Sequence, residues 1–205
     1  MNEFETYIFE IFARTISSWD ASVVEDIYAL AFLILNDDDD LRRPTVRLLY
    51  NTEMEWQRKR DECPNPAEAR WNHPFWLQTA QASIATTYPD FGSQDDTNGI
   101  ALREAWIKQQ GWLYDDQFEE EDFEQALEIG ARICRQFDEM CVRVAAQLRD
   151  VGILSQVFGR DLPIIFFDRE ALSPQAIELT HQANPQALIS EYSAFIGEFE
   201  RWDGA

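Results

Sequence analysis

Two runs of carboxylate side chains are the residues whose type and spacing could do chemistry in this sequence. Their members are Asp37, Asp38, Asp39 and Asp40 in the first run, and Asp115, Asp116, Glu119, Glu120, Glu121 and Asp122 in the second. Paired carboxylates act as general acid and base when their surroundings separate their pKa values. Because the chain holds 38 acidic residues, the sequence singles out no such pair. We therefore assign no catalytic residue.

The two acidic runs have three other interpretations. They can be solvated loops and helix N-termini, where the helix dipole favours carboxylates. They can form an anionic recognition surface that resembles a phosphate backbone to a basic protein. A calcium site is the weakest option, because neither run has the alternating oxygen ligands and turn glycine of an EF-hand loop. We expect no metal and no cofactor.

Other residues that carry chemistry are sparse. His73 and His181 are the two histidines, and no G-x-S-x-G, Walker or G-x-G-x-x-G motif occurs. A nucleophile pair of Cys63 with His73 has only their closeness in the chain to support it. The odd count of three cysteines does not fit a disulfide framework, so we expect reduced thiols and a cytoplasmic protein. No apolar run approaches the ~20 residues that span a bilayer.

The charge and composition limit the function classes. The formal net charge is -21 on 205 residues, yet 45% of the residues are hydrophobic and 13% aromatic, so we expect a folded single domain and not an acidic tail. Such an excess of charge suggests either a basic partner or a salt-rich environment. Nucleic acid is not the expected partner, because phosphates would be repelled. The small arginine clusters at residues 42–47 and 58–60 are interpreted as local charge compensation.

The aromatic residues Trp71 and Trp76 lie in the stretch RWNHPFWLQ. Tryptophan is favoured as an anchor in protein interfaces, so both are candidate partner contacts. A place in the hydrophobic core is the better supported alternative, because indole rings bury a large apolar area.

Hydrophobic periodicity predicts the elements that position these residues. Residues 27–36 are apolar at odd and even positions, which indicates a strand covered on both faces, and residues 45–51 complete a hairpin whose tip is the first acidic run. A further short strand is expected at 163–167. Helices are expected at residues 4–16, 52–62, 101–110, 122–149, 174–182 and 185–199, with a loop at 89–99. The fold class is α+β, with a small mixed or antiparallel sheet packed with several helices.

Several blocks of the chain resemble a family. The segments IYALAFLILN, LLYNTE, RWNHPFWLQ, LRDVGILSQVFGRDLPIIFFD and NPQALI are similar to uncharacterised bacterial immunity-type proteins encoded beside polymorphic or contact-delivered toxins. The resemblance implies a stoichiometric inhibitor that binds a cognate toxin and has no active-site residues. A basic toxin domain would fit the acidic surface. The two acidic runs, with Trp71 or Trp76, are the predicted contacts.

Two alternatives stand beside the inhibitor. A small carboxylate-dependent or metal-dependent hydrolase would gather a few carboxylates with perturbed pKa values in a concave pocket. An acidic housekeeping or scaffold module would spread its charge evenly over the surface. Pairwise neutralisation of the acidic runs by arginine and lysine would argue against the inhibitor.

Overall fold

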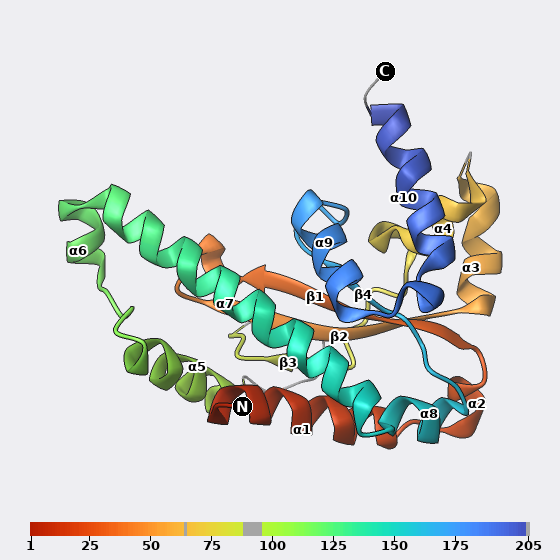
Figure 1. Cartoon of the computed structure of the whole chain (residues 1–205), viewed down its shortest axis with the longest axis horizontal. Coiled ribbons are helices and arrows are strands. Elements are labelled where there is room, and N and C mark those ends of the chain that lie inside the picture. The colour runs from red at the N-terminus through yellow and green to blue at the C-terminus, as the bar shows by residue number, and fades with distance from the viewer. Residues whose placement is uncertain (64, 88–95, 204–205) are drawn as a thin grey trace.

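A four-stranded mixed sheet forms the centre of the protein. The computed structural model describes residues 1–63, 65–87 and 96–203, and it describes side chains as far as residue 199. Strands β1 (Ile27–Asn36) and β2 (Pro44–Thr52) form the predicted hairpin. β3 (Ala82–Ile84) pairs antiparallel with β2, and β4 (Ile164–Phe167) pairs parallel with β1, so the order is β3-β2-β1-β4. The predicted α+β class is confirmed (Figure 1).

The sheet separates two hydrophobic clusters. Leu30 and Phe32 of β1 face the larger cluster, and Ala29, Ala31 and Leu33 face the smaller one. Because successive side chains of a strand point to opposite faces, a strand that is apolar throughout must be covered twice. The prediction that β1 is buried on both faces is confirmed.

The larger cluster lies under four helices that run along one face of the sheet. They are α1 (Glu3–Ser17), α5 (Thr97–Gln109), α7 (Phe123–Asp150) and α8 (Ile153–Phe158), and α9 (Pro174–Ala183) adds residues at its edge. The other face is covered by α4 (Pro66–Trp71) and α10 (Ser190–Asp203). The remaining helices are α2 (Ala21–Val24), α3 (Glu53–Lys59) and α6 (Asp116–Glu121).

Some predicted boundaries were wrong. The last helix begins at Ser190 and not at residue 185, because residues 186–188 form a separate 3-10 turn. Of the predicted loop at 89–99, residues 89–95 lie outside the described part, and Thr97–Gly99 belong to α5, since the Asp96 side chain caps that helix at Gly99 N–H. Helix α8 was not predicted. It is six residues long and lies between Gly152 and Gly159, both with positive φ.

Apolar residues recur along 122–149 at spacings of three and four, which predicts one helix face packed against the core. This prediction is correct only for the part of α7 that lies over the sheet. Ile133, Phe137 and Val144 are buried, whereas Phe123 and Leu127 are exposed. The first turns of α7 extend past the sheet (Figure 1), and α6 covers them on one side, which leaves Phe123 and Leu127 exposed.

Within the described ranges, no helix is both long enough and apolar enough to cross a membrane.

Candidate functional site

The second acidic run builds the projecting end of the molecule. The Asp115 carboxylate accepts a hydrogen bond from Phe118 N–H at 2.9 Å and begins α6, and the Asp122 carboxylate accepts one from Gln125 N–H at 3.1 Å and begins α7. Both are N-caps, as the helix-start interpretation expects. Residues 113–128, which comprise α6 and the first turns of α7, are called the acidic end below.

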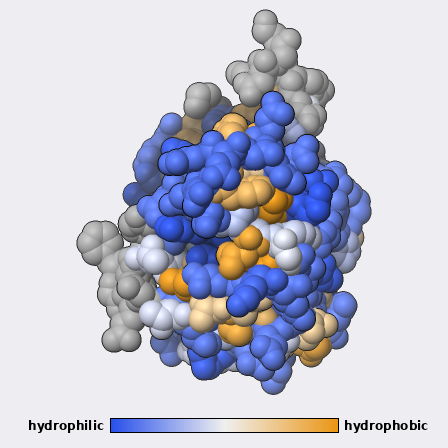
Figure 2. Space-filling view, turned by 90° about the vertical axis from the view of Figure 1, so that its left-hand side faces the viewer, coloured by the Kyte–Doolittle hydropathy of each residue, from blue (hydrophilic) through white to orange (hydrophobic). Residues whose placement is uncertain are grey.

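Apolar side chains are exposed in the acidic end. Phe123 is 63% exposed, Leu127 49% and Leu113 56%. Phe123 and Leu127 are four residues apart and so share one side of α7. They line a depression of about 580 Å³ between the acidic end and the hairpin tip. Figure 2, which views this end of the molecule, shows hydrophobic side chains enclosed by hydrophilic ones.

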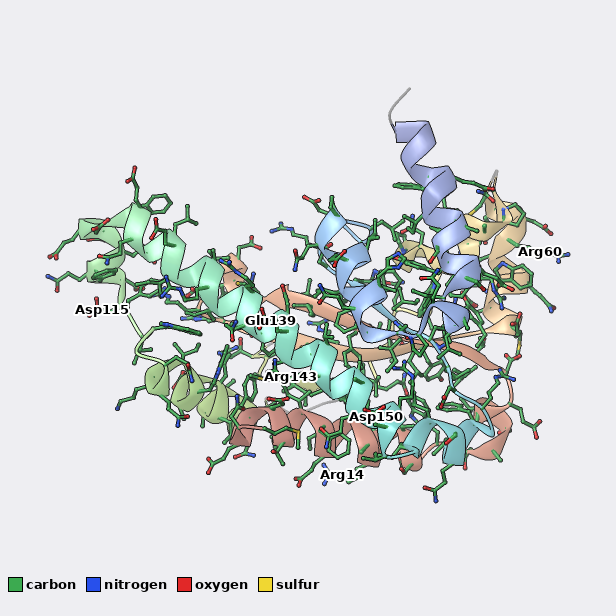
Figure 3. The ribbon with its side chains drawn as sticks, in the orientation of Figure 1. Arg14, Arg60, Asp115, Glu139, Arg143 and Asp150 are labelled. Atoms are coloured by element: carbon green, nitrogen blue, oxygen red, sulfur yellow. The ribbon has the colours of Figure 1, made fainter. Side chains whose placement is uncertain are left out.

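The acidic end carries eight carboxylates and no lysine or arginine. Arg42 of the hairpin contacts two of them, Asp116 at 2.8 Å and Glu119 at 3.7 Å. The other six form no ion pair with any residue that the structure describes; they are Asp115, Glu120, Glu121, Asp122, Glu124 and Glu128. Figure 3 places Asp115 and Arg60 at opposite ends of the long axis. A group of six carboxylates that form no ion pair within the described part of the chain therefore lies at one end of the molecule.

The first residue of the hairpin run is structural, which corrects its assignment to a partner surface. Asp37 is buried, and its carboxylate accepts hydrogen bonds from the Thr86 hydroxyl at 3.0 Å and from the Thr87 backbone N–H at 2.8 Å. These bonds join the hairpin tip to the segment after β3. A buried carboxylate with this many donors fixes the loop and is out of reach of a partner.

The other three carboxylates of the hairpin run are paired with arginines. Asp38 pairs with Arg43 at 2.8 Å, Asp40 pairs with Arg42 at 2.8 Å, and Asp39 pairs with Arg169. Burial alone would raise the pKa of Asp40, but its hydrogen bonds from Arg42 outweigh this effect and hold the pKa below 3.8. The interpretation of this basic cluster as local compensation is confirmed for Arg42 and Arg43, and the tip presents little free negative charge.

Trp71 and Trp76 lie in the smaller core cluster. Both rings meet Tyr28 edge to face, and the Trp76 indole N–H donates to the Arg70 carbonyl at 2.8 Å. Trp71 is 4% exposed and Trp76 is 2% exposed, so the interpretation as core residues is confirmed. Neither side chain is accessible enough to anchor a partner. Phe123 and Leu127 are exposed apolar residues that the sequence did not single out. Their spacing is also that of a buried helix face, so the sequence alone does not show that they are exposed.

Histidine and cysteine side chains fill structural positions. His73 packs against Phe167 at 5.2 Å between ring centroids, and burial lowers its pKa. Burial raises the pKa of the Cys134 thiol to about 11 and raises that of Cys63. Since the thiolate is the nucleophile, both thiols are poorly reactive near neutral pH.

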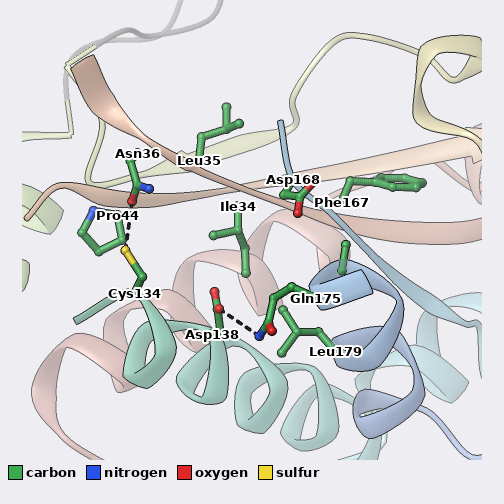
Figure 4. Close-up of a pocket in the computed structure, with 11 residues that line it drawn as sticks. Ile34, Leu35, Asn36, Pro44, Cys134, Asp138, Phe167, Asp168, Gln175 and Leu179 are labelled. Carbon is green, nitrogen blue, oxygen red and sulfur yellow. Dashed lines mark hydrogen bonds between the residues drawn. The ribbon is translucent and has the colours of Figure 1, made fainter. Parts of the chain in front are cut away.

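Two carboxylates that sequence reasoning did not select line one cavity beside the base of the hairpin tip. Asp138 of α7 and Asp168, which follows β4, line a cavity of about 150 Å³ (Figure 4). Among residues 1–63, 65–87 and 96–203, no group of three histidine, cysteine, aspartate or glutamate side chains could hold a metal ion.

Neither the family models, nor the curated proteins, nor the solved structures contained a match to this chain.

Proposed function

We propose that this protein is a non-catalytic immunity protein that binds a basic toxin domain through its acidic end. The observation that carries the proposal is that six carboxylates without an ion pair to any described residue occur in the same segment, residues 113–128, as the exposed side chains of Phe123 and Leu127. Charge and apolar area thus occur together at one accessible place. The hairpin tip has a supporting role, since Arg42 holds α6 beside it.

The carboxylates would speed association. Concentrated charge of one sign steers an oppositely charged partner and raises the association rate constant, an effect that salt screens. An even distribution of charge would instead favour a general acidic module. The concentration of charge between residues 113 and 128 supports recognition.

The apolar side chains would hold the complex together. Burial of a phenylalanine or leucine side chain contributes about 1.5–3 kcal/mol. Anchors of this kind are most effective in the desolvated centre of an interface, with polar groups at the rim. Phe123 and Leu127 line a depression whose other walls include the polar residues Glu119, Arg42 and Arg43, so apolar and polar groups lie side by side there. The inhibitor would then act by covering a basic cleft, without turnover.

The proposal is tested by using the protein to capture its partner from extracts of the source organism and then reconstituting the complex from purified components. The captured protein is identified, purified and titrated against the wild type and two double variants, Glu120→Lys/Glu121→Lys and Phe123→Ser/Leu127→Ser. We expect the charge variant to slow association and the apolar variant to speed dissociation, each weakening binding by about tenfold or more. The wild type should also block the toxic activity of the captured protein.

The matched control is Glu10→Lys/Glu25→Lys, which changes the net charge equally at exposed positions outside the acidic end. It should bind as the wild type does. Equal binding by all four proteins, or a captured protein without any activity that the chain inhibits, would contradict the proposal.

A carboxylate-dependent hydrolase is the second candidate, favoured by the cavity beside Asp138 and Asp168. It predicts a hydrolytic activity of the purified chain that Asp138→Asn abolishes and Glu120→Lys/Glu121→Lys leaves intact. If the protein is instead an immunity protein, Glu120→Lys/Glu121→Lys should reduce protection against the toxin, and Asp138→Asn should leave that protection intact.

A further inference from the structure

The cavity lined by Asp138 lies at the carboxyl ends of the parallel strands β1 and β4. Asn36 ends β1, Asp168 follows β4, and helices α7 and α9 supply the opposite walls. In sheets with parallel strands, ligands bind in the crevice outside these strand ends. The cavity is separate from the acidic end, so its ligand does not depend on the proposed toxin contact.

The walls of the cavity are apolar and the groups that face into it are polar. Ile34, Phe167 and Leu179 provide apolar surface, and Asp138, Asp168 and Gln175 provide polar groups (Figure 4). Its volume of about 150 Å³ matches that of an engineered cavity that accepts benzene, so it suits a ligand of about four to six heavy atoms. Gln175 lines the cavity and is exposed to solvent.

The two carboxylates differ in their hydrogen bonds. The Asp168 carboxylate accepts bonds from the Ser173 hydroxyl and from Glu170 N–H. The Asp138 carboxylate accepts a long bond of 3.3 Å from the Gln175 amide. Asp138 therefore has spare acceptor capacity directed at the cavity.

The charges that act on Asp138 most strongly are negative, namely those of Asp168 and Glu139. The thiols of Cys134 and Cys141 also lie near it on α7, whereas Arg135 on the same helix is exposed and Arg169 pairs with Asp39. No lysine or arginine occurs among the described residues that line the cavity. Burial, followed by Asp168 and Glu139, raises the pKa of Asp138 to about 7, while the Gln175 bond lowers it. The site lacks a positive charge.

We propose that this cavity binds a short alkylammonium group, with the ammonium facing Asp138 and Asp168 and the alkyl chain against Ile34, Phe167 and Leu179. An ammonium donates up to three hydrogen bonds and supplies the missing charge. A neutral ligand of equal size would fill the apolar volume but leave the carboxylates uncompensated. The ammonium is either that of a free small amine or that of a lysine side chain.

Titration of the full chain with n-butylammonium chloride tests the proposal. Nuclear magnetic resonance of the Asp138 carboxyl carbon should show saturable binding and a fall in the pKa of Asp138 by about one unit or more. Asp138→Asn should weaken binding by about tenfold or more, and n-butanol should bind the wild type more weakly than n-butylammonium by a similar factor. Asp150→Asn, at the exposed end of α7, should bind as the wild type does.

A second ligand distinguishes the two sources of the ammonium. If Nα-acetyl-lysine N-methylamide binds as n-butylammonium does, a lysine side chain reaches the site. If n-butylammonium alone binds, the ligand is a free amine. No saturable binding of either cation, or equal binding to the wild type and Asp138→Asn, would overturn the proposal.

Discussion

At the scale of single residues, neighbouring carboxylates of one run serve different purposes. Asp37 is buried and holds Thr86 and Thr87, whereas Asp39 is exposed and pairs with Arg169. Their partners lie 49 or more positions away in the chain. Local sequence therefore cannot distinguish the two, because burial and partners come from the tertiary fold.

Replacement of these two residues should separate their contributions to stability. Asp37→Ala removes the carboxylate that accepts from the buried Thr86 hydroxyl and from Thr87, and should lower the free energy of unfolding by about 2–3 kcal/mol. Asp39→Asn breaks an exposed ion pair and should cost less than about 1 kcal/mol, since asparagine tolerates the positive φ at this position. Urea denaturation at neutral pH measures both. Equal losses would contradict the structural role of Asp37.

The titration of Asp138 should appear in the pH dependence of stability. Its pKa is about 7 when folded and about 3.8 when unfolded, so the folded state binds the proton more tightly. The stabilisation that comes from protonated Asp138 is therefore fully present below about pH 4. It decreases as the pH rises to 7 and is absent above pH 7. Asp138→Asn should remove this decline, so the variant should gain stability relative to the wild type, by an amount on the order of 3 kcal/mol, between pH 4 and pH 8.

Free energies of unfolding from urea titrations at a series of pH values test this expectation. A constant difference between Asp138→Asn and the wild type across the series would show that Asp138 titrates normally.

At the scale of elements, helix α7 changes its surroundings along its length. Its central part packs on the sheet, and its first turns meet α6 and the hairpin tip, where Leu41 approaches Gly130. Strand β1 is covered on both faces, so its residues are apolar without interruption. Because such a run is visible in the sequence, the range of β1 was predicted exactly. The exposed turns of α7 were predicted as core because three-and-four spacing does not reveal where the sheet ends.

The contact between α7 and the hairpin tip can be tested at Gly130. A Cβ atom there would lie 2.7 Å from the Leu41 Cβ atom and 3.2 Å from the Tyr114 hydroxyl. Gly130→Ala should therefore destabilise the protein by about 1–3 kcal/mol, although alanine favours helix. Thermal and urea denaturation measure the change.

Gly197→Ala on α10 is the matched control. No described heavy atom lies within 4 Å of the added Cβ, so this variant should be neutral or more stable by up to about 1 kcal/mol. A stabilising effect at both positions would contradict the close approach of Leu41.

At the scale of the whole molecule, the sequence predicted the fold class and the strand pairing of the hairpin but not the position of free charge. The net charge of -21 is a property of composition. Its distribution depends on which arginines reach which carboxylates, as Arg169 reaches Asp39 and Arg42 reaches Asp116. The proposed binding contact is accordingly the acidic end and no longer the hairpin tip.

Concentrated charge should make the stability of the protein depend on salt. Repulsion within the acidic end opposes folding and is screened by salt, so the free energy of unfolding should rise with sodium chloride by an amount on the order of 1 kcal/mol. Glu120→Lys/Glu121→Lys should reduce this dependence more than Glu10→Lys/Glu25→Lys, although both change the net charge equally. Identical salt dependence of the two variants would mean that position does not matter.

The most direct test of the central claim is a hydrogen-exchange footprint of the protein bound to its captured partner. If the acidic end is the contact, backbone amides in α6 and the first turns of α7 should exchange more slowly in the complex, while amides of α2 and α3 should be unchanged. A footprint that leaves residues 113–128 unprotected and falls elsewhere would contradict the account.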